Sequence, residues 1–345
     1  MFDKLEAAAS HISEIQRKVK DSAVALHNSK PVFEEALEKE LTIPVGASVI
    51  NGNICAVDGG LLAQEMYGID LLVGRAVSVN FSYSDSKLVK SEYFPNAFPE
   101  PSYEVKMGLD EHEIMLYRTL FRLDLEISSA ISAVEKFHPC ALILDGSIVP
   151  LATDRPSESG NHEVFEKYQE VIGKYGTLYN LCKTGGTLLL GITKDSRGRR
   201  FMDIAGKEAG GRWPDSVFLN QLLKEKERTF AMKYSSNPSK HAVLRDLKDY
   251  ADSICLFYLK CFNEDRPMRV EFLNNSNPSI TNFNEIASIA YSLSAINKSY
   301  AYPAVLIEAD LRAALDPIEM ERALKTLSSL SEHVQPLKRN SRPFR

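Results

Sequence analysis

Two short segments of the chain place an aspartate directly after an apolar run and directly before a glycine. Asp58 ends the run ICAV and precedes Gly59 and Gly60, and Asp145 ends the run ALIL and precedes Gly146. An acidic side chain at the end of a buried strand is held rigidly, which suits a metal ligand or a catalytic acid. Aspartate followed by glycine is also a common turn pair, so either segment alone is more easily explained as a turn.

A third acidic residue lies on a long predicted helix between these two segments. Residues 111–137 carry apolar residues at helical spacing, which predicts an amphipathic helix with one buried stripe. At about 100° per residue, Glu126 falls about 80° from the centre of the stripe, at the edge of the buried face. Asp124 lies at the opposite border and Glu135 lies beyond it on later turns, so both remain alternatives to Glu126.

Asp58, Glu126 and Asp145 come from three elements that can converge at one end of a sheet. Carboxylates a few ångströms apart raise one another's pKa, and a divalent cation removes that electrostatic cost. Hard oxygen ligands suit Mg²⁺ or Mn²⁺, which polarise a phosphoryl oxygen and activate water, so a phosphodiester is the expected substrate. We further expect Gly59 and Gly60 to let a metal-bound phosphate backbone approach without meeting a Cβ atom.

The segment KDSRGRR supplies concentrated positive charge in an acidic protein. It holds Lys194, Arg197, Arg199 and Arg200 against one acid, whereas the whole chain has a formal net charge of -5. The overall charge argues against nonspecific coating of nucleic acid, but a basic loop at a strand end can hold DNA by its phosphates. Lys194 is the predicted phosphate contact in the site, and the arginines are predicted to flank the DNA path. A solvated surface loop is the alternative interpretation.

The remaining composition narrows the class of protein. Five cysteines without a C-x-x-C pair and seven histidines without metal-ligand spacing argue against disulfides and against a zinc site. No apolar stretch reaches the roughly 20 residues that span a bilayer, and the N-terminus lacks the apolar segment of a signal peptide. We therefore expect a cytoplasmic protein in which any metal is held by carboxylates.

The order of predicted elements indicates a single elaborated α/β domain without repeats. An amphipathic helix is expected within residues 1–40, followed by antiparallel strands at 53–58 and 71–84 and an irregular, proline-containing excursion at 91–110. After the helix that carries Glu126, strands and helices alternate. The further strands are expected in CALILDGSIVPLA, GTLLLGITKD, SICLFYLKC and MRVEFL, and the further helices at 162–182, 214–228, 284–297 and 303–333.

Six segments of the chain follow one another in an order known from one family. They are AVDGG (56–60), the R-x-x-x-E step from Arg122 to Glu126, LILDGS (142–147), GITKDSRGR (191–199), PMRVEF (267–272) and AYPAVLIEAD (301–310). Together they resemble the NurA nucleases, archaeal and bacterial DNA-end-processing enzymes that work with the hexameric helicase-translocase HerA. The resemblance spans about residues 50 to 315. It implies a ribonuclease H-like α/β fold with a mixed sheet and flanking helices.

In this fold we expect an N-terminal helical extension over residues 1–45, a nuclease domain over 46–335 and a basic, flexible tail over 336–345. The amphipathic N-terminal helix is a candidate for contacts with a second subunit or with the motor. Packing of its apolar stripe on its own subunit is the alternative.

The resemblance implies a metal-dependent deoxyribonuclease with two Mn²⁺ or Mg²⁺ ions in its active site. Asp58, Glu126 and Asp145 match the family's metal-binding carboxylates, and Tyr302 matches its C-terminal active-site tyrosine. Asp310 falls where some relatives carry a histidine. A carboxylate there can bind a metal, but it cannot replace a neutral imidazole as a proton shuttle.

The resemblance also implies a biological role. It predicts 5′–3′ exonuclease and single-strand endonuclease activity on single- and double-stranded DNA, in end resection, double-strand break repair and homologous recombination. The protein would be a cytoplasmic, nucleoid-associated homodimer docked on a HerA-type helicase. A catalytically silent scaffold that binds DNA or a motor is the alternative, although the intact carboxylates speak against it. An aspartyl phosphomonoesterase is disfavoured because Ser147 stands where a second aspartate would be needed.

Overall fold

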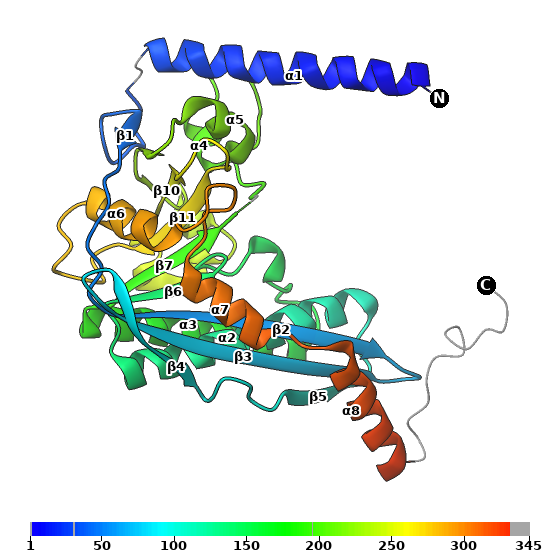
Figure 1. The fold of residues 1–345 in the computed structure, drawn as a ribbon. Coiled ribbons are helices and arrows are strands. Elements are labelled where there is room, and N and C mark those ends of the chain that lie inside the picture. The colour runs from blue at the N-terminus through cyan, green and yellow to red at the C-terminus, as the bar shows by residue number, and fades with distance from the viewer. Residues whose placement is uncertain (1, 30–31, 195, 332–345) are drawn as a thin grey trace.

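The computed structural model of the chain describes residues 2–29, 32–194 and 196–331 (Figure 1). The basic tail predicted over 336–345 lies outside the described residues. No helix in these ranges is long and apolar enough to cross a lipid bilayer.

A mixed sheet of 11 strands runs through the described ranges. Its order is β1-β8-β10-β11-β7-β6-β2-β3-β4, with β5 paired to β3 and β9 paired to β10. The strands are β1 (Thr42–Pro44), β2 (Gly52–Glu65), β3 (Asp70–Ser84), β4 (Lys87–Phe94), β5 (Ser102–Lys106), β6 (Ala141–Asp145), β7 (Leu188–Thr193), β8 (Glu227–Thr229), β9 (Met232–Lys233), β10 (Ile254–Lys260) and β11 (Met268–Leu273). The pairs β2–β6 and β6–β7 are parallel, and the other pairs are antiparallel. The predicted mixed α/β class is confirmed.

Helices cover both faces of this sheet. The α-helices are α1 (Phe2–Ser29), α2 (Glu111–Phe137), α3 (His162–Gly185), α4 (Arg200–Ala205), α5 (Asp215–Leu222), α6 (Phe283–Ser294), α7 (Ala304–Ala313) and α8 (Pro317–Leu330). On one face α2 and α3 pack over Val57 and Leu144. On the other face α6 and α7 pack over Ala56 and Ile143, and α7 crosses β2 in Figure 1. Because β6 is covered on both sides, its apolar run is continuous.

The helix predicted at 111–137 is confirmed as α2, and its ends follow from local chemistry. Asp110 and Glu113 form a capping box, in which each side chain accepts a hydrogen bond from the other residue's backbone N–H. At the other end His138 takes a left-handed conformation, and Pro139 follows it. These two stops fix the rotation of the helix and therefore the direction in which Glu126 points.

The irregular excursion expected at 91–110 is wrong in part. Its first residues complete β4 and a later part forms β5, and both strands pair with the long strand β3. All three prolines of the segment, Pro95, Pro99 and Pro101, lie between these two strands. Proline cannot donate to a strand ladder, so it separates the strands without preventing either from forming.

The helix expected at 214–228 is likewise shorter than predicted. It is α5, which ends at Leu222 and is followed by β8, and the loop that carries the arginines runs into an additional short helix, α4.

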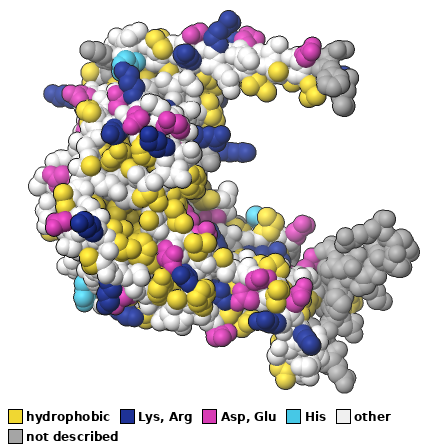
Figure 2. All heavy atoms as spheres, viewed as in Figure 1, with side chains coloured by type: hydrophobic (Ala, Val, Ile, Leu, Met, Phe, Trp, Pro, Cys, Tyr) yellow, Lys and Arg dark blue, Asp and Glu magenta, His cyan; other side chains and the backbone are white. Residues whose placement is uncertain are grey.

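The amphipathic helix expected within residues 1–40 is α1, which ends at Ser29. Val19, Ala23 and Leu26 are buried against the cluster that includes α4 and α5, whereas Leu5 and Ile12 are exposed. Only the second half of the apolar stripe therefore packs on this chain. Figure 1 shows the first half of α1 extending past the body, and Figure 2 shows a hollow below it.

Candidate active site

Asp58 and Asp145 lie beside each other on adjacent parallel strands. The register of β2 and β6 pairs Val57 with Leu144, so the two aspartates are the next residues in line. Neighbouring strands lie about 4.8 Å apart, and aligned residues of a parallel pair point to the same face. The structure thus brings together the two aspartates that the sequence places 87 positions apart.

Both aspartates face the side of the sheet that carries α7. Side chains alternate along β2, so Asp58 shares the face of Ala56, which packs against α6 and α7. Tyr302, just before α7, donates its hydroxyl hydrogen bond to Asp145 Oδ1, and its hydroxyl lies 3.2 Å from the carbonyl oxygen of Ile192. The predicted tyrosine is therefore in contact with a predicted carboxylate.

Glu126 approaches from α2 on the opposite face. A Cβ atom added to Gly59 would lie 2.6 Å from Glu126 Cγ and 2.8 Å from Glu126 Oε1, so this side chain lies directly over the glycine. Glu126 Oε1 also accepts a hydrogen bond of 2.6 Å from Arg122 Nη1, one helical turn earlier. Arg122 entered the sequence prediction only as a motif marker, although its i,i+4 spacing from Glu126 is the signal of such an ion pair.

The predicted reason for the two glycines is wrong. Gly59 makes room for Glu126, and a Cβ atom on Gly60 would collide with the carbonyl oxygen of Ala313 at the end of α7. The absent side chains therefore admit protein atoms from both faces of the sheet. They allow α2 and α7 to close on the strand that carries Asp58, rather than leaving space for a phosphate.

The electrostatics of this group are unfavourable to negative charge. Burial, and next the neighbouring charge of Asp145, raise the pKa of Asp58 to about 7. Burial raises the pKa of Glu126 to about 8, although the Arg122 guanidinium opposes the shift. The pKa of Asp145 is also raised, by its partial loss of water in the cleft and by the charge of Asp310, against the hydrogen bond from Tyr302.

Asp310, on α7, belongs to the same electrostatic group. Its side chain is exposed, and its charge raises the pKa of both Asp58 and Asp145. Tyr302 has a raised pKa because of its burial and the nearby Asp145 charge, so it stays protonated and keeps donating its hydrogen bond.

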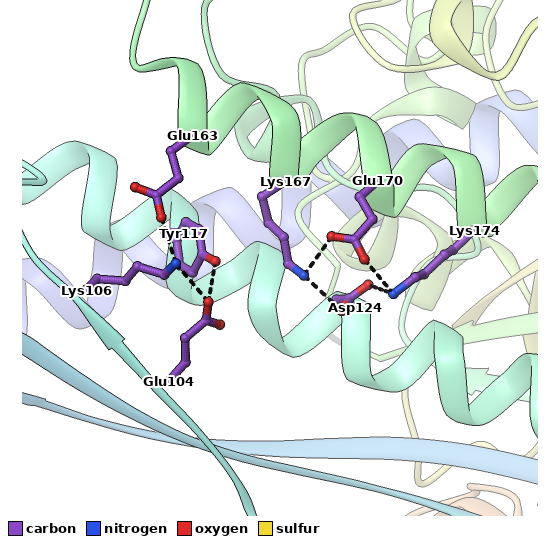
Figure 3. Close-up of polar contacts among 8 residues, drawn as sticks. All are labelled: Glu104, Lys106, Tyr117, Asp124, Glu163, Lys167, Glu170 and Lys174. Carbon is purple, nitrogen blue, oxygen red and sulfur yellow. Dashed lines mark hydrogen bonds and ion pairs between the residues drawn. The ribbon is translucent and has the colours of Figure 1, made fainter.

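The two alternatives to Glu126 do not reach this group. Asp124 accepts hydrogen bonds from Lys167, at 2.9 Å, and from Lys174, both of which lie on α3. Figure 3 shows this carboxylate enclosed by the two lysines and Glu170. Glu135 is exposed near the end of α2. The position of each acid around the helix, relative to the apolar stripe, therefore determines its environment.

A cleft with a volume of 580 Å³ opens in front of Glu126 and Asp145. Its wall includes Lys194 and Arg197 from the basic loop, and Arg122 beside the carboxylates. Negative and positive side chains thus share one concave site, as a site for a phosphate ester bound near a metal requires.

The four basic residues predicted to contact DNA have different environments. Arg197 is exposed at the cleft and forms no ion pair within the described ranges. Lys194 lines the cleft but pairs with Asp265, and Arg199 lies 3.9 Å from Asp203 outside the cleft lining. Only part of the predicted basic path is therefore directed at the site.

Arg200 was predicted to flank the DNA path, but it is buried. Its side chain is 8% exposed, because it packs at the start of α4. The guanidinium pairs with Glu35 at 2.8 Å and donates to the Lys233 carbonyl and to Ser236 Oγ. These contacts fix the segment after α1 to the body, so Arg200 is a structural residue.

Arg269 and Glu271 form a buried pair that lines the cleft. Arg269 Nε donates to Glu271 Oε1 at 2.7 Å. The other oxygen of Glu271 accepts from Ser147 Oγ at 2.6 Å and from the Ile148 N–H at 3.0 Å. The pair therefore fixes the turn that follows Asp145.

The donor set fits a hard divalent cation in its chemistry. Asp58, Glu126 and Asp145 have raised pKa values, which a cation would lower, and the charge of Asp310 acts on the two aspartates. Among the residues that the structure describes, however, no three His, Cys, Asp or Glu side chains have their donor atoms arranged as a metal site.

Comparison with known proteins identifies the family. The sequence matches the NurA domain over residues 52–315. The chain belongs to the NurA family. No curated protein sequence gave a significant match.

Solved NurA structures share the fold. The NurA nuclease from Sulfolobus solfataricus is 19% identical, with 95% of each chain covered and a TM-score of 0.61. A NurA bound to dAMP and manganese is 10% identical, with 95% of this chain and 97% of that chain covered and a TM-score of 0.61. A further NurA structure with manganese is 10% identical, covers 82% of this chain and 91% of that chain, and has a TM-score of 0.51. The resemblance to NurA seen in the sequence is confirmed.

Proposed function

We propose that this NurA protein is a metal-dependent DNA nuclease. The observation that carries the proposal is the alignment of Asp58 and Asp145 on adjacent parallel strands, with raised pKa values, where Asp145 lines a cleft together with Arg197 and Lys194. Membership of a family that includes the NurA nuclease from Sulfolobus solfataricus and two NurA structures with manganese supports the same conclusion.

In this proposal Asp58, Asp145 and Glu126 hold the cation, and Asp310 adds negative charge at the same place. The proposed cofactor is Mn²⁺ or Mg²⁺, with two ions per active site. These ions would polarise the phosphodiester and lower the pKa of the attacking water. Tyr302 orients Asp145 through its hydroxyl hydrogen bond. The buried pair of Arg269 and Glu271 keeps the turn after Asp145 rigid.

DNA would lie along the cleft with its phosphates next to Arg197, an exposed cation of the basic loop that lines the cleft. Lys194 supplies a second positive charge in the wall, and Arg199 lies farther along the loop. Phosphate contacts of this kind position the strand without reading its sequence.

Incubation of a labelled single-stranded oligonucleotide with the protein tests the proposal. Cleavage in Mn²⁺ that EDTA abolishes supports the enzyme. Binding in both conditions without products supports the alternative, a ribonuclease H-like scaffold that holds DNA or a motor without cutting. The Asp58→Asn protein serves as the control for a contaminating nuclease.

We extend the proposal to the family's wider role: 5′–3′ exonuclease and single-strand endonuclease activity in end resection and repair, with a HerA-type helicase and as a homodimer. The exposed first half of α1, with Leu5 and Ile12, is the proposed contact surface. Light scattering of a protein that lacks residues 2–14 tests the dimer. If the shortened protein still has the mass of a dimer, the first half of α1 is not the dimer contact.

A further inference from the structure

Asp265 lies on the connection between β10 and β11, away from both the carboxylate group and the basic loop in sequence. Its side chain is 9% exposed, although the residues on either side, Glu264 and Arg266, are exposed. An acidic side chain that turns inward from a surface connection has lost hydration and requires partners.

One oxygen of Asp265 joins two segments of the active site. Asp265 Oδ2 accepts from Lys194 Nζ, directly after β7, and from the Ala301 N–H at 2.6 Å, in the segment that enters α7. Asp265 Oδ1 accepts from the N–H of Arg266 at 2.7 Å. Both oxygens are therefore occupied, and the carboxylate is fixed in orientation.

The two segments lead directly to the proposed chemistry. Lys194 lines the cleft, and its ammonium lies 4.1 Å from the centre of the Tyr300 ring. That ring is 5.7 Å from the ring of Tyr302, whose hydroxyl donates to Asp145. The Ala301 N–H that Asp265 holds belongs to the peptide bond between Tyr300 and Ala301, and Ala301 is the residue immediately before Tyr302.

We propose that Asp265 is a positioning residue of the nuclease site, an inference that rests on the proposed function. It fixes the Lys194 ammonium in the cleft wall, and through the Ala301 peptide it fixes Tyr302 against Asp145. A phosphate that enters the cleft meets a lysine that Asp265 already holds in place. The Lys194 side chain therefore loses little conformational freedom when the phosphate binds.

The test compares Asp265→Asn, Lys194→Met and the double variant in steady-state cleavage of an oligonucleotide in Mn²⁺. Asparagine keeps an acceptor for the Ala301 N–H and removes the charge that holds the lysine. We expect Asp265→Asn to lower kcat/KM by about 10–100-fold, the range seen when a residue that orients an active-site group is lost. The kcat/KM of the double variant should not fall below that of the less active single variant, because both substitutions remove the same interaction between Asp265 and Lys194.

Asp252→Asn is the matched control. Asp252 pairs with Lys233 at 2.9 Å, but both side chains are largely exposed and lie outside the cleft lining. This variant should stay within about twofold of the wild type, as expected for a surface ion pair. Thermal unfolding of every variant separates loss of positioning from loss of fold. Asp265→Glu, which keeps the charge, should recover most of the activity that Asp265→Asn loses. If Asp265→Asn does not fold, Lys194→Met, which removes the ammonium that Asp265 holds, carries the test, and wild-type activity in that variant would overturn the inference.

Three outcomes would overturn the inference. Wild-type activity in Asp265→Asn would show that the contact positions nothing. Multiplying losses in the double variant would show that Asp265 does not act through Lys194. A wild-type protein that never cleaves would remove the proposed function itself, and this result is distinct from variants that match an active wild type.

Discussion

Asp124 and Glu126 lie two residues apart on α2, at opposite borders of its apolar stripe. The two carboxylates differ in the charges that surround them. Asp124 is neutralised by two lysines of α3, and Figure 3 shows it inside an ion-pair network. Glu126 has one cation, Arg122, and its burial, followed by the nearby charges of Asp58 and Asp145, raises its pKa to about 8. One carboxylate stabilises the packing of two helices, and the other is kept in an unfavourable place.

The difference teaches where to look for chemistry in this fold. A structural acid is surrounded by cations that offset its lost hydration, whereas a group of acids that share too few cations stores an electrostatic cost that a ligand can remove. We therefore expect substitutions in the two regions to have different effects. In the Asp58 group they should abolish activity without lowering the stability of the folded state, whereas around Asp124 they should lower that stability and leave activity nearly unchanged.

The largest expected effect is on catalysis at the paired aspartates. Asp58→Asn or Asp145→Asn should lower Mn²⁺-dependent cleavage by roughly 10³-fold or more, because the cation loses a ligand. The melting temperature in EDTA at pH 8 should stay the same or rise, since like charges are removed. A variant that cleaves at the wild-type rate would show that the site lies elsewhere.

The matched substitution on α2 is Asp124→Asn. It should destabilise the protein by about 1–3 kcal/mol, because Lys167 and Lys174 lose the acceptor of a charged hydrogen bond. Denaturant unfolding measures this change, and cleavage at a temperature well below the transition should stay within about threefold. A collapse of activity in the folded variant would erase the proposed contrast between the two acids.

The pH dependence of stability sharpens the comparison further. Asp58 and Glu126 have folded-state pKa values of about 7 and about 8, above their ordinary values near 4. The folded state therefore binds more protons than the unfolded state between these limits, so stability in EDTA should fall as pH rises from about 4 to about 8. In Asp58→Asn the fall should be smaller. Melting curves at matched ionic strength measure it, and equal slopes for both proteins would contradict the assigned environment.

The smallest expected effect concerns Arg197. Replacement by Gln should weaken binding of single-stranded DNA only a few-fold and reduce the salt dependence of log Kd by about one contact. Arg200→Gln should instead lower the melting temperature, because Arg200 holds Glu35, the Lys233 carbonyl and Ser236 Oγ. Fluorescence anisotropy over a salt series separates the two arginines. Equal salt slopes for wild type and Arg197→Gln would remove Arg197 from the DNA path.

Local pattern predicted much of what positions the site. The end of β6 at Asp145 and the border position of Glu126 on α2 follow from the periods of strand and helix. The strand expected to end at Asp58 is wrong in its end, because β2 continues through Gly59 and Gly60 to Glu65 and keeps pairing with β3. Their meeting depends on pairing of β2 with β6, which the resemblance to a known fold suggested and local pattern could not. The single sheet likewise includes β5, which three prolines concealed in the sequence.

Residue type alone could not sort the basic loop or explain the glycines. Arg200 is structural because Glu35, 165 positions earlier, reaches it, and Lys194 is fixed by Asp265 from a connection 71 positions later. Gly60 is required by the end of α7, far along the chain. Each of these contacts joins distant segments, so composition and spacing carry no signal of them.

Calorimetric titration of Mn²⁺ into the metal-free protein tests the central claim most directly, because it measures the cation without relying on cleavage. The account predicts saturable binding to the wild type and to Asp124→Asn, and loss of that binding in the Asp58→Asn, Asp145→Asn double variant. Equal Mn²⁺ binding by the wild type and the double variant would contradict it.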